Sequence, residues 1–175
     1  MKIQTITTGS TLVSTATPDR STHRWKYAYT GLFQRRSKRI EVPVKCYYVR
    51  VNGHSVLIDT GWSKEVVEHG LQHLGFGLWF ASEPVMKQGE SAKEQLSGHQ
   101  IDAILMTHLD CDHVSGLLDF TGIDITLQLR RLTLLPERRC VMVNWLKGLI
   151  SKPLISKMTN MRRLPNLAMY SAMAA

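Results

Sequence analysis

The sequence is poor in cysteine and contains no long apolar run. Its three cysteines, Cys46, Cys111 and Cys140, cannot complete a disulfide framework, and none of them has CxxC or CxxH spacing. No apolar stretch approaches the roughly 18 residues of a membrane span, and no apolar core follows Lys2 as it would in a secretory signal. These absences predict a protein without a membrane segment that works in a reducing, cytoplasmic compartment.

Acidic residues are nearly absent from the end of the chain. Residues 1–124 hold thirteen Lys and Arg against thirteen Asp and Glu, whereas residues 125–175 hold nine basic residues and Glu137 alone. The formal net charge of +8 therefore lies entirely in the C-terminal region. Such a charge favours polyanionic partners. The basic residues there do not alternate with aromatic ones, however, which makes nucleic-acid binding the weakest functional hypothesis.

The chain has the length of one domain, at 175 residues. Residues 42–51 are β-branched and aromatic and lead through an Asn-Gly turn into residues 55–58, which predicts a β-hairpin. A sheet faced by helices, an α/β fold, is the simplest packing of the predicted elements. These are strands at 2–8, 42–51, 55–58 and 101–106, helices at 63–74, 90–96 and 114–120, and a long loop at 17–38.

Four potential metal ligands follow the apolar strand predicted at 101–106. They are His108, Asp110, Asp112 and His113. Alternate side chains of an extended segment share a side, so the first three can converge, and His113 follows at the start of a helix. Imidazole and carboxylate are the donors that catalytic zinc and related divalent metals use. A second carboxylate cluster, Asp59 in the turn LIDTGW, ends the hairpin strand.

Each cluster alone also has a purely structural interpretation. Asp110 or Asp112 could cap the helix that begins near Val114, and an isolated Asp-Thr-Gly is usually a turn. Cys111 is predicted to be a small packed residue, because its acidic neighbours raise the pKa of its thiol. Trp62 either lines the mouth of a pocket or packs in the core. The other histidines lie outside ligand spacing and are expected to be structural or on the surface: His23, His54, His69, His73 and His99.

Residues 107–116 (THLDCDHVSG) resemble the HxHxDH signature of the metallo-β-lactamase superfamily, and LIDTGW resembles the upstream aspartate turn of that family. Residues 28–62 most resemble the branch that contains N-acyl-homoserine-lactonase-like hydrolases. The resemblance implies the N-terminal half of an αββα sandwich, assigned to residues 1–122. It also implies a metal-dependent hydrolase that acts on ester or lactone bonds of small molecules.

The resemblance further implies roles for single residues. His108 and Asp110 would face one metal ion, and Asp112 and His113 the other. Asp59 would support the site from behind, and Asp112 would also orient the nucleophilic water. The implied cofactor is a pair of Zn²⁺ ions. Mn²⁺ and Fe²⁺ are alternatives, because Asp110 stands where the signature usually has histidine and a carboxylate suits harder ions.

The ligands that the family supplies further along the chain are missing. The family completes its site with a histidine in a GHTxG-like loop, a bridging aspartate and a final histidine. Here no histidine follows His113 and no aspartate follows Asp124. The site therefore cannot be completed from this polypeptide.

The composition of the tail suggests a cause for this loss. It is rich in methionine, and permitted codons for residues 157–175, shifted by one base, give an acidic and aromatic sequence typical of the lactonase-like branch. We therefore predict a change of reading frame near residues 122–126, which would make residues 123–175 an out-of-frame, poorly ordered basic tail. The alternative is a genuine basic C-terminal region.

Three functional hypotheses follow. A working hydrolase would need its missing ligands from elsewhere, such as a partner chain. A truncated product would be inactive and would expose an apolar face and an unpaired sheet edge. A nucleic-acid binder would act through the basic tail. The sequence favours the second of these, a truncated and inactive hydrolase.

Overall fold

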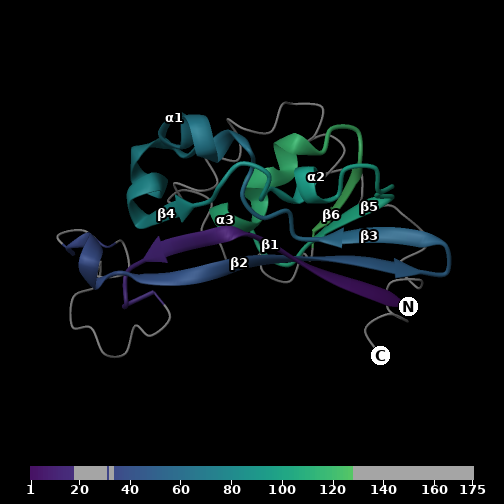
Figure 1. The fold of residues 1–175 in the computed structure, drawn as a ribbon, viewed down its shortest axis with the longest axis horizontal. Coiled ribbons are helices and arrows are strands. Elements are labelled where there is room, and N and C mark those ends of the chain that lie inside the picture. Colours follow the sequence, from purple (N-terminus) through teal and green to yellow (C-terminus); the bar gives the residue numbers. More distant parts are fainter. Residues whose placement is uncertain (18–30, 32–33, 128–175) are drawn as a thin grey trace.

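The computed structural model describes residues 1–17, 31 and 34–127. Six strands form one mixed sheet in the order β4-β1-β2-β3-β5-β6, and the helices lie on one face of it (Figure 1). None of the helices in these residues is long and apolar enough to cross a bilayer. The elements are β1 (Lys2–Val13), η2 (Arg36–Lys38), β2 (Ile40–Val51), β3 (His54–Ile58), α1 (Glu65–Ala81), β4 (Ser82–Val85), α2 (Ala92–Gln95), β5 (Ala103–Met106), α3 (Cys111–Val114), η3 (Ser115–Asp119) and β6 (Asp124–Leu127).

The hairpin of β2 and β3 forms where the sequence predicts it. The two strands are antiparallel, and β1 pairs antiparallel with the other side of β2. The turn residues Asn52 and Gly53 have φ angles of 51° and 83°. Asparagine and glycine accept these left-handed values at low cost, which is why this pair of residues closes the hairpin.

The strands β3, β5 and β6 form the parallel part of the sheet. Ile104 and Met106 of β5 are fully buried, as expected for a short apolar strand inside a sheet. Because β3 and β5 are parallel neighbours, their carboxyl ends lie at the same edge of the sheet. Asp59 follows the end of β3, and Thr107 follows the end of β5. The topology therefore brings the two candidate motifs to one place.

The core lies between the sheet and its helices. Trp62 belongs to it, because its ring is fully buried and its indole Nε1 donates to the Ser10 carbonyl over 3.1 Å. Of the two interpretations of Trp62, packing in the core is the one that the structure supports. One buried cluster comprises Ile6, Cys46, Tyr48, Leu57, Ala92, Leu96, Ile104, Met106, Val114, Leu117, Phe120 and Ile125, and a second comprises Val44, Trp62, Val66, Leu74 and Cys111.

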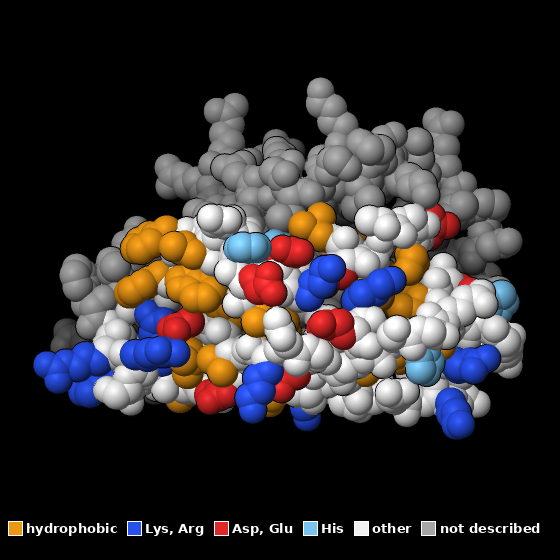
Figure 2. Space-filling view, turned by 45° about the horizontal axis from the view of Figure 1, so that its top comes forward, with side chains coloured by type: hydrophobic (Ala, Val, Ile, Leu, Met, Phe, Trp, Pro, Cys, Tyr) orange, Lys and Arg blue, Asp and Glu red, His pale blue; other side chains and the backbone are white. Residues whose placement is uncertain are grey.

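Some apolar side chains remain outside this core. On the helix side of the molecule they gather over α1, where Phe76 is 75% exposed and Leu71 is 51% exposed (Figure 2). The ring of Phe76 stacks on that of Phe80 with centroids 6.1 Å apart. The apolar pattern of α1 therefore continues past its buried stripe onto the surface.

The predicted α/β fold, with helices on one face of a sheet, is confirmed, but several boundaries differ. The helix predicted at 63–74 extends to Ala81, with non-helical backbone at His69 and Gly75. The helix predicted at 114–120 begins three residues earlier as α3 and continues as the 3-10 turn η3. Strands β4 and β6 are not predicted. Most of the loop predicted at 17–38 lies outside the described residues, as do residues 128–175 of the tail predicted at 123–175, whereas residues 124–127 of that tail form β6.

Candidate metal centre

Two turns that are about fifty residues apart in sequence are joined by hydrogen bonds at the carboxyl edge of β3 and β5. The Thr60 backbone N–H and hydroxyl both donate to the His113 carbonyl, over 3.0 and 2.7 Å. The Gly116 N–H donates to the Gly61 carbonyl over 2.9 Å. A Cβ at Gly116 would lie 2.6 Å from the Thr60 carbonyl oxygen, so only glycine permits this approach. The backbone thus fixes the Asp-Thr-Gly turn against the histidine loop.

Asp59 is the buried anchor of the site. Its side chain accepts three hydrogen bonds: Oδ1 from the Thr107 N–H at 2.8 Å, Oδ2 from the Thr107 hydroxyl at 2.7 Å, and Oδ2 from His113 Nδ1 at 3.0 Å. Burial would raise the pKa of Asp59, but the hydrogen bonds from His113 and Thr107 outweigh it and lower this pKa. Asp59 is therefore an ionised carboxylate, and both of its oxygens accept hydrogen bonds from the residues that carry the site, Thr107 and His113.

The same hydrogen bonds determine which nitrogen of each histidine carries the proton. His113 Nδ1 must donate, because its partner Asp59 is a carboxylate that can only accept. The Thr107 hydroxyl donates its only proton to Asp59. It must therefore accept a hydrogen bond from His108 Nδ1, which lies 2.8 Å away. In its neutral form each imidazole therefore carries its lone pair on Nε2, the atom that binds a metal ion when Nδ1 donates elsewhere.

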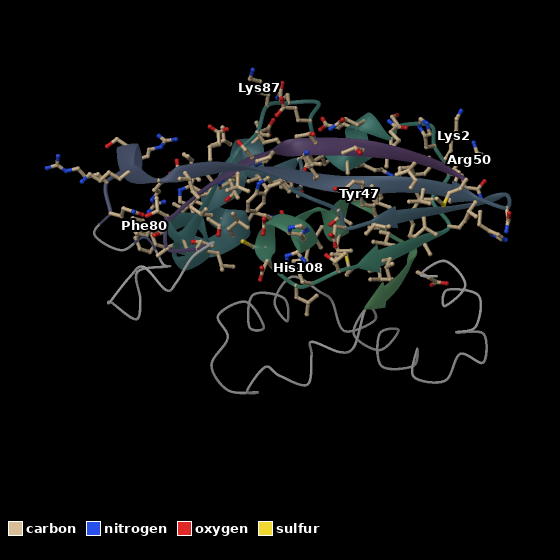
Figure 3. The ribbon with its side chains drawn as sticks, turned by 90° about the horizontal axis from the view of Figure 1, so that it is seen from below. Lys2, Tyr47, Arg50, Phe80, Lys87 and His108 are labelled. Atoms are coloured by element: carbon tan, nitrogen blue, oxygen red, sulfur yellow. The ribbon has the colours of Figure 1, made fainter. Side chains whose placement is uncertain are left out.

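The free Nε2 atoms lie beside carboxylates. His108 Nε2 is 3.4 Å from Asp110 Oδ2, and His113 Nε2 is 3.5 Å from Asp112 Oδ2. The two rings themselves are close, with centroids 3.9 Å apart, and His108 faces outward from the sheet (Figure 3). The four predicted ligands thus form two imidazole–carboxylate pairs that meet at the histidine rings.

The surroundings of Asp112, His113 and Cys111 raise the pKa of each of these three groups. Burial raises the pKa of Asp112, although the charge of His113 opposes this effect. Burial alone would lower the pKa of His113, but the hydrogen bond to Asp59 and the charge of Asp112 outweigh it and raise that pKa. Burial, assisted by Asp112, raises the pKa of Cys111 to about 12. The expectation that Cys111 is a packed thiol is confirmed, because its side chain is buried in the cluster that contains Trp62.

The donor set fits a divalent metal ion. Within the described residues, Asp59, His108 and His113 offer ligand atoms that all lie within 4.8 Å of one another, and neither Asp110 nor Asp112 belongs to this group. Imidazole nitrogens with carboxylates beside them are what zinc, manganese and iron bind in proteins. Asp110 occupies the position before α3 but makes no side-chain cap hydrogen bond there, so the interpretation of Asp110 as a helix cap is not supported.

Sequence reasoning missed several residues that hold the site together. Thr107 links Asp59 to His108 through its hydroxyl. Its position between the predicted strand at 101–106 and His108 was the one sequence feature that could have indicated this role. Ser115 of η3 contacts both α1 and the turn before it: its Oγ accepts from the Ser63 N–H over 3.1 Å and lies 2.9 Å from His73 Nε2. The Ser63 hydroxyl donates to Asp119 over 2.9 Å. His73 comes from α1, and no spacing in the sequence connects it to this loop.

Comparison with known proteins identifies the family. Residues 39–130, more than half of the chain, match the model of the metallo-beta-lactamase superfamily, and the chain therefore belongs to this superfamily. No curated protein sequence matches the chain.

Solved structures share the fold. An N-acyl homoserine lactone hydrolase with the product N-hexanoyl-L-homoserine bound at its catalytic metal center aligns with a TM-score of 0.58 and 20% identity, over 81% of this chain and 54% of that one. An AiiA mutant from B. thuringiensis with N-decanoyl-L-homoserine at its active site aligns with a TM-score of 0.57 and 19% identity, over 81% and 54%. The chain therefore spans about half the length of these structures.

Proposed function

We propose that the chain carries the first half of the active site of a metal-dependent hydrolase. The observation that supports this most directly is the pair of imidazoles whose Nδ1 atoms are held by Asp59 and Thr107, so that their Nε2 atoms are free to bind metal. Chains of hydrogen bonds from a carboxylate to a histidine are the usual support of metal-binding imidazoles, because they fix both the tautomer and the orientation of the ring.

The proposed roles follow the two imidazole–carboxylate pairs. His108 and Asp110 would hold one metal ion, and Asp112 and His113 a second. A divalent cation at this position supplies Lewis-acid activation of water and of a substrate carbonyl. Asp112 would orient the nucleophilic water through its carboxylate, and Asp59 would keep His113 in place. Zinc is the first choice of metal. The carboxylate of Asp110, where the family usually has histidine, also suits manganese or iron.

The proposed substrate is a small molecule with an ester or lactone bond. Two features support this class: the resemblance of residues 28–62 to lactonase-like hydrolases, and the acyl-homoserines bound in two proteins with the same fold, one at a catalytic metal center and one at an active site. The substrate would approach from the carboxyl edge of β3 and β5, where ligands bind in open α/β sheets. A reducing cytoplasmic compartment is the proposed location.

We further propose that the chain does not turn over substrate by itself. The sequence supplies no histidine after His113 and no aspartate after Asp124, so the proposed metal ions would lack donors on one side. A change of reading frame within residues 122–126 remains our explanation for this loss. Sequencing the gene tests it, because the shifted frame should encode a GHTxG-like loop downstream. A gene without such a region would contradict the explanation.

Lactone hydrolysis measured with and without added metal tests the function itself. The chain alone should be inactive. A version in which the original reading frame is restored after residues 122–126 should hydrolyse an acyl-homoserine lactone. His108→Ala in the restored version should abolish that activity. Hydrolysis by the chain alone, at the rate of the restored version, would contradict the proposed incomplete site.

A further inference from the structure

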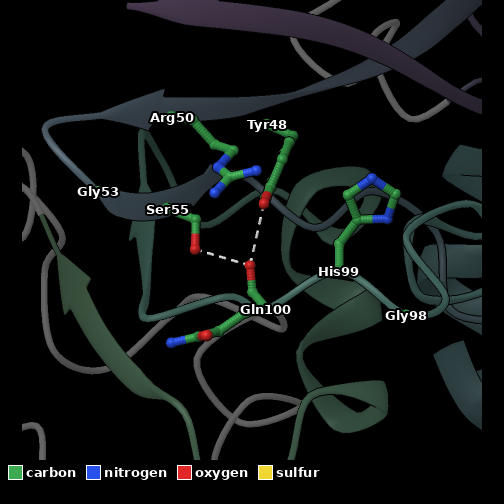
Figure 4. A pocket seen from close by; sticks show the side chains of 7 residues that line it. All are labelled: Tyr48, Arg50, Gly53, Ser55, Gly98, His99 and Gln100. Atoms are coloured by element: carbon green, nitrogen blue, oxygen red, sulfur yellow. Dashed lines mark hydrogen bonds between the residues drawn. The ribbon is translucent and has the colours of Figure 1, made fainter.

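A polar pocket lies at the end of the sheet opposite to the candidate metal centre. It encloses about 380 Å³ of empty space, part of which is open to solvent. Residues of β2 and β3 form its floor, and the loop between α2 and β5 forms its wall (Figure 4). Ser55 of the floor stands four residues before Asp59, which corresponds to about 13 Å along a strand. The pocket is therefore separate from the histidine site.

Hydrogen bonds hold the wall of the pocket in place. The hydroxyls of Tyr48 and Ser55, both buried, donate to the Gln100 carbonyl over 3.1 and 2.7 Å. The Asp102 N–H donates to the Ser55 carbonyl over 2.9 Å. The His99 ring packs edge-on against Tyr48, with centroids 5.4 Å apart. The pocket is therefore formed before any ligand arrives, which lowers the entropic cost of binding.

The charge in this pocket is positive. Arg50 lines it, and no carboxylate in the described part of the chain forms a salt bridge with Arg50. Lys2 of β1 lies directly across the ladder from Arg50, and the two cations stand together at the end of the sheet away from His108 (Figure 3). Like charges at facing positions of a sheet repel each other. A bound anion between them would relieve that repulsion.

Asp102, a carboxylate two residues beyond Gln100 of the pocket wall, is hydrogen-bonded to other groups. Asp102 Oδ2 accepts from the Ser55 N–H over 2.7 Å and lies 3.1 Å from the Ser55 hydroxyl oxygen, and Oδ1 accepts from Gln100 Nε2 over 2.6 Å. The hydrogen bonds from Ser55 and Gln100 lower the pKa of Asp102. The negative charge of Asp102 is therefore stabilised by Ser55 and Gln100, and Asp102 does not neutralise the positive charge of Arg50.

We propose that this pocket binds a small oxyanion, a phosphate or carboxylate group, on the guanidinium of Arg50, with Lys2 beside it and the His99 imidazole on the wall. The planar fork of an arginine matches two oxygens of such a group. Gly53 and Gly98 border the pocket without side chains, and a Cβ at either would meet nothing within 4 Å. The mouth therefore has room for an anion that is part of a larger small molecule.

Calorimetric titration of the whole chain with inorganic phosphate, at constant ionic strength, tests the proposal. We expect saturable binding in the millimolar range or tighter, weakened about tenfold or more by Arg50→Gln and less by Arg50→Lys, which keeps the charge but loses the fork. Lys45→Gln is the matched control, because it removes a charge from the same strand on the opposite face. A parallel titration with acetate shows whether phosphate or carboxylate is preferred.

Two results would overturn the proposal. One is the absence of saturable binding of either anion. The other is equal weakening by Arg50→Gln and Lys45→Gln, which would indicate general attraction to a positive surface. Binding must also persist in His108→Ala and in the presence of a chelator, because loss under these conditions would assign the anion to the histidine site instead. This control separates the pocket from the proposed hydrolase function.

Discussion

Asp59 Oδ2 accepts a hydrogen bond from His113 Nδ1 over 3.0 Å, and the same oxygen accepts from the Thr107 hydroxyl that orients His108. One carboxylate therefore sets the tautomer of both histidines. It does so from a left-handed backbone conformation, with φ of 57°, which aspartate and asparagine tolerate better than most residues.

Asp59→Asn is expected to weaken metal binding by about 10- to 100-fold, the usual effect of losing a partner behind a metal-binding histidine. Asparagine keeps the backbone conformation but offers only one acceptor oxygen, so His113 or Thr107 loses its partner. Titration with Zn²⁺ measures the effect. Asp102→Asn makes the same chemical change at the other end of the strands and should leave zinc affinity unchanged. Equal losses in both variants would contradict this role of Asp59.

Asp110→His is expected to shift metal preference toward zinc. Asp110 stands 3.4 Å from His108 Nε2, and an imidazole in its place restores the usual family signature with a softer donor. Competition between Zn²⁺ and Mn²⁺, measured on both chains, should show a higher ratio of zinc to manganese affinity in the variant. An unchanged ratio would mean that residue 110 does not touch the metal.

Gly116→Ala is expected to destabilise the fold by about 3 kcal/mol, because its Cβ would press against the Thr60 carbonyl and separate the two turns. Chemical denaturation measures the change. Gly77→Ala serves as the control: it lies in α1, its Cβ would meet nothing within 4 Å, and it should be neutral or stabilising by up to about 1 kcal/mol. A small effect of Gly116→Ala would show that the turns are not held this closely.

His73 should make stability depend on pH. Burial lowers the pKa of His73, although the charge of Glu65 opposes this, so the unfolded chain binds a proton at a higher pH than the folded one. The stabilisation is fully present above the unfolded pKa of about 6.5 and is lost as pH falls through the lower folded pKa. Denaturation midpoints between about pH 7.5 and pH 5 should fall less in His73→Gln than in the parent chain. His69→Gln, an exposed histidine of the same helix, is the control, and an equal reduction in slope there would contradict the prediction.

The fold was predictable where local chemistry agrees with the final structure. The Asn-Gly turn and its alternating flanks specify the hairpin, and the apolar run at 101–106 specifies a buried strand, now β5. Edge strand β4 was missed because Pro84 and Glu83 give it no strand pattern, and it exists through pairing with β1. The extension of α1 was missed because Gly75 breaks the helical pattern, yet the chain turns there with φ of 74° and continues as helix.

The candidate site was predictable in composition but not in its supporting bonds. The residue types of the two motifs suggested a metal centre before their positions were known. The roles of Thr107, Ser115 and His73 depend on how α1 and the two turns pack, and tertiary packing leaves no trace in local spacing. The proposed ligand roles of Asp110 and Asp112 remain predictions.

The most direct test is titration of the purified chain with Zn²⁺, together with its His108→Ala and His113→Ala variants and His54→Ala as a control outside the site. We predict weak binding of no more than two ions per chain, since the two imidazole–carboxylate pairs form only part of a catalytic site. Binding should be lost in both site variants and kept in the control. Zinc binding that survives in His108→Ala and His113→Ala, or its absence from the parent chain, would contradict the proposed metal centre.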